Sequence, residues 1–221
     1  MKRWRKWLVM IGILLIAVTT AFLVACTSSH DDNHMTTESM PHSSDVMDHG
    51  MGHYMDLGPA DETYDLRFID GMIVHHEGAV EMAREALLKS QRPEILELAE
   101  AIIAAQADEI ELMNRWKNEW YPQADAAPVA YDPASGQNVA MTPAQIDAMK
   151  MSGDLGAQDD EFDLRFIEAM VPHHQSAVDM ALDALAKSQR AEIRNIANEI
   201  IAEQKTEIDL MMSWKNLWYG R

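Results

Sequence analysis

Residues 65–121 recur without a gap as residues 163–219, and this internal repeat limits the possible folds more than any other feature of the chain. The two copies share 34 of 57 residues. Each copy contains two segments with apolar residues at helical spacing, separated by the sequence KSQR. One helical hairpin cannot bury both of its apolar faces, but two hairpins can do so by packing together. The repeat therefore predicts an all-α four-helix bundle built from two duplicated helical hairpins.

The repeats also predict the domain boundaries. We expect the first helical hairpin at residues 59–121 and the second at residues 159–221, joined by a Pro/Ala/Gly-rich linker at residues 122–158. Within that linker, the sequence MTPAQIDAMKM predicts a short helix with Thr142 as its N-cap and Pro143 in its first turn.

The first 26 residues have the pattern of a targeting segment. A basic start, MKRWRK, precedes a long apolar run that ends in LVAC. This ending resembles the lipobox of bacterial lipoproteins, so residues 1–26 are expected to be a lipoprotein signal peptide with Cys26 as the lipidation site. The alternative is an uncleaved N-terminal membrane anchor. Both interpretations predict an extracytoplasmic protein anchored to a membrane of the cell envelope, on the periplasmic or the outer cell surface.

Cysteine content and charge exclude several classes of function. Cys26 is the only cysteine, so the chain has no internal disulfide and no cysteine-based zinc or iron–sulfur site. The net charge is -18, which argues against nucleic-acid binding because the chain would repel phosphates. The acidic charge suits cations, although it also fits a simpler role in solvating helix surfaces.

Residues 27–58 are polar, lack hydrophobic periodicity and are expected to form a disordered tether. They contain five histidines and five methionines, and a low-complexity linker would have little reason to prefer methionine. We therefore predict a second, weaker metal-binding region. Its donors would be His30, His34, Met35, Met40, His42, Met47, His49, Met51, His53 and Met55.

The other four histidines form two pairs, His75–His76 and His173–His174, at the same place in each repeat. Helical spacing puts each pair on the apolar face that should point into the bundle, beside methionines one or two turns away. Neutral imidazoles and thioethers together suit Cu(I), whereas Cu(II), Zn(II) or Ni(II) would bind mainly through the imidazoles. The predicted ligands are Met72, His75, His76, Met82, Met170, His173, His174 and Met180.

The second helix of each repeat adds polar residues to its apolar stripe. Gln106, Glu109 and Met113 recur as Gln204, Glu207 and Met211, with the two methionines as further candidate ligands. A buried carboxylate needs a partner. Glu109 could hold a histidine N–H behind the metal site, with the glutamines in similar supporting positions, or it could pair with Arg67 in a purely structural role. The sequence leaves both alternatives open.

Unusual residues also adjoin the histidine pairs. Pro172 lies within the second pair's helix, and Gly71 and Gly78 flank the first pair. Such residues can kink a helix or let a neighbouring segment approach closely. Plain packing is the alternative explanation for them, as it is for the buried methionines.

The motifs FIDGMIVHHEGAVEMA and FIEAMVPHHQSAVDMA, followed by IIAAQADEIELMNRW and IIAEQKTEIDLMMSW, resemble the family called domain of unknown function 305 (DUF305). The resemblance covers about residues 60–121 and 140–220, as two tandem copies. It implies a ferritin-like four-helix fold. The family includes exported copper-binding proteins of the CopM type, implicated in copper resistance. By this resemblance, the Met/His-His/Met residues of both repeats are the expected copper ligands.

A catalytic role finds no support in the sequence. A di-iron oxidase needs Glu-x-x-His motifs, but the residues three before His75 and His76 are Met72 and Ile73. A c-type haem needs Cys-x-x-Cys-His, which the sequence lacks. We therefore expect no enzyme but a copper-binding protein that sequesters, buffers or transfers the ion, with other copper-handling proteins as partners. The alternative is a lipid-anchored structural or adaptor bundle without a high-affinity metal site.

Overall fold

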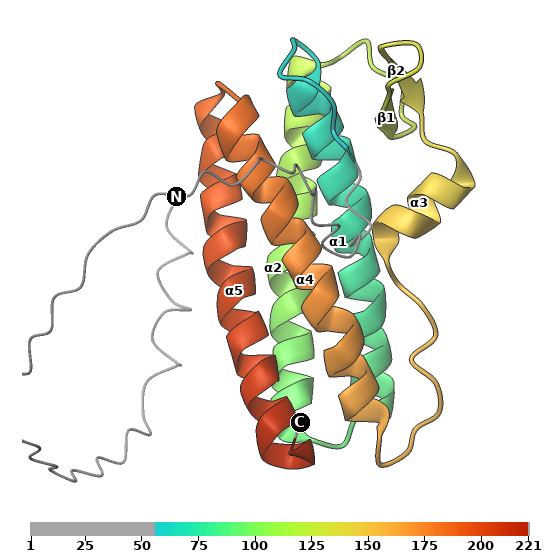
Figure 1. Cartoon of the computed structure of the whole chain (residues 1–221), viewed down its shortest axis with the longest axis vertical. Coiled ribbons are helices and arrows are strands. Elements are labelled where there is room, and N and C mark those ends of the chain that lie inside the picture. Colours follow the sequence, from blue (N-terminus) through green and yellow to red (C-terminus); the bar gives the residue numbers. More distant parts are fainter. Residues whose placement is uncertain (1–55, 221) are drawn as a thin grey trace, which may run out of the picture. The chain divides into compact units, whose positions relative to one another are not determined.

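The structure is a computed structural model that describes residues 56–220. In that range the chain forms four long helices, one short helix and a two-stranded hairpin (Figure 1). The elements are α1 (Tyr64–Lys89), α2 (Pro93–Trp120), β1 (Val129–Asp132), β2 (Gln137–Ala140), α3 (Pro143–Lys150), α4 (Phe162–Lys187) and α5 (Ala191–Tyr219). The predicted leader and most of the predicted tether lie outside the described residues. No helix in the described range is long and apolar enough to span a membrane.

The four long helices form the predicted bundle of two helical hairpins (Figure 1). α1 packs against α2, α4 packs against α5, and the two hairpins contact each other mainly through α1 and α4. Pro172 is accommodated inside α4, which runs without interruption from Phe162 to Lys187. The all-α four-helix fold predicted from the repeat is therefore confirmed.

The bundle core consists of two separate apolar clusters. The first combines the N-terminal half of α1 with the C-terminal half of α4, together with residues from the C-terminal half of α2 and the N-terminal half of α5. The second combines the opposite half of each helix. Between the two clusters every long helix carries polar residues. These residues, which we call the polar layer, are His75, His76, Gln106, Glu109, His173, His174, Gln204 and Glu207.

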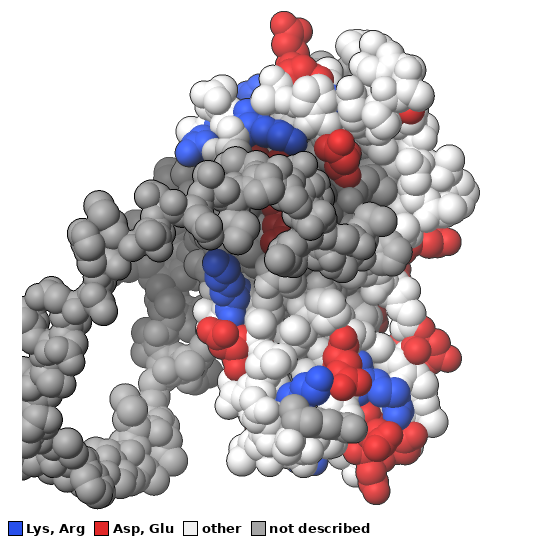
Figure 2. Space-filling model, viewed as in Figure 1, with Lys and Arg blue, Asp and Glu red and all other residues white. Residues whose placement is uncertain are grey.

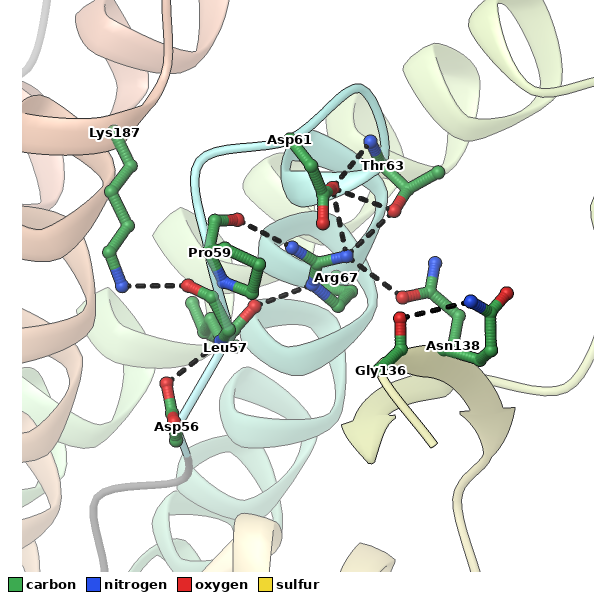
Figure 3. Close-up of polar contacts among 11 residues, drawn as sticks. Asp56, Leu57, Pro59, Asp61, Thr63, Arg67, Gly136, Asn138 and Lys187 are labelled. Atoms are coloured by element: carbon green, nitrogen blue, oxygen red, sulfur yellow. Dashed lines mark hydrogen bonds and ion pairs between the residues drawn. The ribbon is translucent and has the colours of Figure 1, made fainter. Parts of the chain in front are cut away.

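The loops before α1 and α4 are held in the same way, which extends the repeat beyond its helices. Arg67 is 1% exposed and donates to the carbonyl oxygens of Leu57 and Pro59, at 2.5 Å and 2.7 Å (Figure 3). Its counterpart Arg165 holds the carbonyl oxygens of Leu155 and Ala157 at 2.6 Å and 2.7 Å. These arginines fix the point at which each hairpin begins.

Lysines at the ends of α1 and α4 connect each repeat to the loop of the other. Lys187 Nζ donates to the Gly58 carbonyl oxygen at 2.8 Å (Figure 3), and Lys89 Nζ donates to the Gly156 carbonyl oxygen at 2.6 Å. Because each contact joins residues of different repeats, the pair fixes how the two hairpins pack.

The spacer between the hairpins packs on α1 and contains more structure than the sequence predicted. The short helix α3 begins as expected, with Thr142 in a capping box with Gln145. The hairpin β1–β2 was not predicted. It is antiparallel, pairs Val129 with Ala140, and is fixed to α1 by the hydrogen bond from the Val129 N–H to Asp70 Oδ2 at 2.9 Å. The spacer thus covers one face of the first repeat.

Charged side chains lie intermixed on the face of the bundle shown in Figure 2, where Lys and Arg groups lie beside Asp and Glu groups. Ion pairs among the described residues include the pair between Lys150 Nζ and Glu81 Oε1 at 2.6 Å. Part of the acidic charge is therefore paired at the surface, in line with the simpler alternative for the net charge.

Candidate metal centre in the polar layer

The four paired histidines lie at the centre of the bundle, and all four are 0% exposed. Each pair occupies two successive positions on α1 or α4, and both positions are buried because these helices contact each other and their hairpin partners. The rings of His75 and His173, which are equivalent residues of the two repeats, have centroids 3.8 Å apart. The rings of His173 and His174 have centroids 6.2 Å apart. The structure therefore brings the two predicted pairs together into one cluster.

Three of the four imidazoles are oriented by an acceptor at Nε2. His76 Nε2 lies 2.7 Å from Glu109 Oε2, and His174 Nε2 lies 2.7 Å from Glu207 Oε2. His173 Nε2 lies 3.0 Å from the carbonyl oxygen of Lys150. Carboxylate and carbonyl oxygens accept hydrogen bonds, so Nε2 carries a hydrogen in each of these three contacts.

These contacts decide between the two alternatives for Glu109. The carboxylate holds His76, whereas Arg67 binds the loop before α1 and Asn138 of the hairpin (Figure 3). Glu207 holds His174 in the same way in the second repeat. Such a carboxylate fixes the tautomer and raises the basicity of the imidazole, which is how outer partners prepare a histidine to bind a metal.

The central imidazoles are neutral. Burial and the neighbouring His173, His76 and His174 lower the pKa of His75 well below its usual value. Burial, together with His174 and His76, lowers the pKa of His173 to about 3. A second positive charge at this distance would be repelled in a medium of low dielectric constant. Neutral rings leave lone pairs free for an electrophile.

Among residues 56–220, the polar layer contains buried nitrogen and oxygen atoms that have no hydrogen-bond partner. Five of them are imidazole nitrogens: both nitrogens of His75, and Nδ1 of His76, His173 and His174. Each such atom costs about 1–3 kcal/mol when it is left unpaired in the interior. Native proteins keep few of them, and a concentration of them in one place calls for an explanation such as a bound ion. Gln106 and Gln204 add one unpartnered side-chain oxygen each.

The six predicted methionines are buried, at 0–1% exposed, but they are grouped differently from the expectation. The sequence placed Met72 and Met82 together beside the first histidine pair. In the structure they lie in different apolar clusters, because His75 and His76 separate them along α1. Each side of the polar layer instead combines methionines of both repeats: Met72, Met113 and Met180 on one side, and Met82, Met170 and Met211 on the other.

The methionine thioethers are important for metal binding because the polar layer offers few other donor groups to one ion. Within residues 56–220, no three side chains drawn from His, Cys, Asp and Glu lie close enough together to hold one metal ion. Any ion bound here would therefore need methionine sulfur or a low coordination number. Soft thioether donors favour Cu(I) over the harder divalent ions.

Two contributors to the cluster were not predicted. One is the Lys150 carbonyl at the end of α3, which reaches His173 from the spacer. The other is Gly78, where a Cβ atom would overlap Lys150. The sequence partly indicated the role of Gly78, because this glycine lies close to the first histidine pair. The ten predicted tail ligands and Cys26 lie outside the described residues.

Comparison with known proteins identifies the family. The model for the domain of unknown function DUF305 matches residues 65–215, a range that includes both hairpins. The chain belongs to this family of four-helix proteins, as its motifs predicted. That it holds two tandem copies of the domain stays a prediction. No curated protein matches the chain significantly.

Solved structures of the family are similar to this chain. The Cu(I)-bound form of CopM is 35% identical, with a TM-score of 0.54, and the match covers 70% of this chain and 97% of CopM. The Cu(II)-bound form is also 35% identical, with a TM-score of 0.57 and the same coverage. A DUF305 fragment from Deinococcus radiodurans is 26% identical, with a TM-score of 0.52, and the match covers 71% of this chain and 97% of the fragment.

Proposed function

We propose that this chain binds copper in the polar layer of its bundle and holds the ion for sequestration, buffering or transfer. The observation that carries the proposal is the set of five buried imidazole nitrogens without hydrogen-bond partners. Imidazole nitrogens that stay unpaired in the interior cost free energy, and their lone pairs are ligands for a soft cation. A bound ion would compensate the cost of burying them.

The donor set supports copper, with Cu(I) favoured. The imidazoles would offer Nδ1 lone pairs, and three methionines flank each side of the layer. Thioethers bind Cu(I) well and iron poorly, while the imidazoles also permit Cu(II). The similarity to CopM, whose structures contain Cu(I), Cu(II) or Ag, supports copper as the ion, while the preference for Cu(I) rests on the thioethers alone.

Binding fits this site better than turnover. The histidines are fully buried, and their Nε2 atoms are used to orient three of the rings. Acid–base catalysis would need a group that exchanges protons near neutral pH, but the pKa of His173 is lowered to about 3 by burial and its neighbours. We therefore assign the layer a storage role rather than a catalytic one.

The N-terminal segments complete the proposed function. Lipidation at Cys26 would anchor the protein to a membrane of the cell envelope, and the tether would capture ions with its histidines and methionines before they enter the bundle. Ligands on a tether are not preorganised, so they would bind weakly and exchange quickly. Other copper-handling proteins are the expected source or destination of the ion.

A Cu(I) competition titration against a chromophoric chelator tests the proposal. The full chain is compared with a variant lacking residues 27–55 and with a variant in which His75, His76, His173 and His174 are changed to Ala. Tight binding should survive the tail deletion and be lost in the four-histidine variant, with helical content from circular dichroism as the folding control. If tight binding were lost on deletion of residues 27–55, the tail would be the copper-binding region and the bundle only its scaffold. No competition by any form would favour the adaptor alternative.

A further inference from the structure

The last turn of α3 ends against the polar layer. Lys150 is the final residue of α3, so its carbonyl oxygen has no amide partner within the helix. The chain leaves the helix at once, because Met151 adopts a left-handed conformation with φ of 47°. The free carbonyl oxygen lies 3.0 Å from His173 Nε2. An orphan acceptor of the spacer thus pairs with an imidazole of the second repeat.

Gly78 of α1 is what lets the spacer come this close. A Cβ atom at position 78 would overlap the Lys150 carbonyl oxygen and would lie 2.7 Å from its carbon and 2.9 Å from its Cα. These are backbone atoms, so they cannot move aside as a flexible side chain can. The equivalent residue of the second repeat is Ser176, and among residues 56–220 no short helix or strand packs on α4 as the spacer packs on α1.

Surface contacts fix the same turn on α1. Lys150 Nζ pairs with Glu81 at 2.6 Å and with Glu77 at 3.6 Å. Ser152 Oγ donates to the second oxygen of Glu81 at 2.8 Å. The position of the Lys150 carbonyl is therefore set by three independent features: the end of the helix, the space at Gly78 and the anchor at Glu81.

The contact makes two equivalent histidines different. His173 has an acceptor at Nε2, whereas neither nitrogen of its counterpart His75 has a hydrogen-bond partner. The rings lie side by side, with centroids 3.8 Å apart. The hydrogen bond therefore sets the tautomer and orientation of the His173 ring, whereas no hydrogen bond from the described residues does so for the His75 ring.

We propose that the last turn of α3 fixes His173 in the Nε2–H tautomer and so selects Nδ1 as its metal-binding atom, with Gly78 as the positioning residue. This inference rests on the proposed copper-binding function. It assigns the spacer to the site and makes the two halves of the site non-equivalent, with a preset ligand at His173 and an adaptable one at His75.

Nitrogen-15 NMR of the histidine rings tests the contact in the full chain without metal. Wild type should show Nε2 of His173 protonated and Nδ1 unprotonated. In Gly78→Ala the displaced carbonyl should release the ring into a mixture of tautomers, and Cu(I) affinity should fall by about 10–100-fold. Gly71→Ala is the matched control for the tautomer, because its added Cβ would meet only side-chain atoms, at 3.3–3.4 Å.

A surface variant tests the same contact if Gly78→Ala does not fold. Glu81→Ala removes the anchor of Lys150 and Ser152 without adding bulk, and the Nε2–H of His173 should then exchange faster with solvent. The Nε2–H of His174, held by Glu207, should not change. Unchanged exchange at His173 would contradict the inference.

Two results separate the inference from the function. A proton on Nδ1 of His173 in the metal-free wild type would overturn the inference alone. Failure of the wild-type chain to bind Cu(I) would overturn the proposed function, and with it the metal-binding role of Nδ1.

Discussion

His75 and His173 occupy equivalent positions in the two repeats and lie together at the bundle centre, with ring centroids 3.8 Å apart and planes inclined by 44°. Burial and the neighbouring rings lower the pKa of both, so neither ring is charged. Two neutral imidazoles stabilise an apolar core poorly, because their polar atoms are cut off from water. Their juxtaposition supports the proposal of a cation that the two repeats would hold jointly.

The carboxylates behind the histidines should tune metal affinity. Glu109→Gln or Glu207→Gln removes the negative charge that orients His76 or His174 while keeping the side-chain size. Each change should lower Cu(I) affinity by about 10–100-fold, as loss of outer partners does in other metal sites. Competition titration measures this effect. Glu111→Gln, at an exposed ion pair on the same helix, is the control, and an equal loss there would contradict the assignment.

Arginines at the helix starts should stabilise the packing of the two repeats. Arg190 lies 4.1 Å from the centroid of the Trp120 ring and 3.3 Å from Asp65, both in the first repeat. Arg190→Ala should reduce the free energy of unfolding by about 1–2 kcal/mol, since a cation–π contact and a partly exposed ion pair are both lost. Urea denaturation measures the change.

The first repeat offers a matched variant, whose contacts lie in the second repeat. Arg92 makes the same contacts with Trp218 and Asp163, at 4.4 Å and 3.2 Å, so Arg92→Ala should have a similar cost. Arg115→Ala breaks only an exposed pair and should change stability by less than about 0.5 kcal/mol. An equal loss of unfolding free energy in Arg115→Ala and Arg190→Ala would show that the contacts between repeats contribute no more to stability than an exposed ion pair.

Glu203 should make the metal-free protein less stable as pH rises. Glu203 lies on the exposed side of α5, but partial desolvation, followed by the charges of Glu109, Glu207 and Glu199, raises its pKa from 4.5 to about 7. Below pH 4.5 the carboxyl is protonated in both folded and unfolded chains. Between 4.5 and 7 only the unfolded chain releases the proton, so stability falls over that window. Above pH 7 the midpoint temperature of thermal unfolding should therefore be higher for Glu203→Gln than for wild type, by a small margin because solvent screens an exposed charge.

The difference between the stability curves of wild type and Glu203→Gln isolates the effect of Glu203, because both proteins contain His75 and His173. These histidines change stability with pH in the opposite direction. Their lowered pKa values give stability that is lost as pH falls below their usual value. Parallel curves for wild type and Glu203→Gln between pH 4.5 and 7 would contradict the assignment.

The sequence predicted the features that periodicity and repetition encode. The internal repeat, at an offset of 98 residues, predicted the four-helix bundle. Helical spacing predicted that His75, His76 and Met72 lie in the interior. Helical spacing also placed Met82 in the interior, but the side of the polar layer on which a methionine lies depends on how the two hairpins cross. Helix spacing within one repeat carries no such information.

Other details of the site arise from long-range contacts. Glu109 had two candidate partners in sequence, and only the folded bundle shows that it lies 2.7 Å from His76. The Lys150 carbonyl is a backbone group, so no side-chain pattern marks it. The hairpin β1–β2 was also missed, because its short strands have mixed burial and little alternation.

X-ray absorption at the copper edge is the most direct test of the central claim, that imidazole and thioether groups of the polar layer hold copper together. The Cu(I)-loaded chain lacking residues 27–55 should show nitrogen and sulfur neighbours around the ion. Changing His75, His76, His173 and His174 to Ala should remove the nitrogen neighbours. Sulfur neighbours alone in the otherwise unchanged bundle, or oxygen neighbours in place of both, would contradict the account.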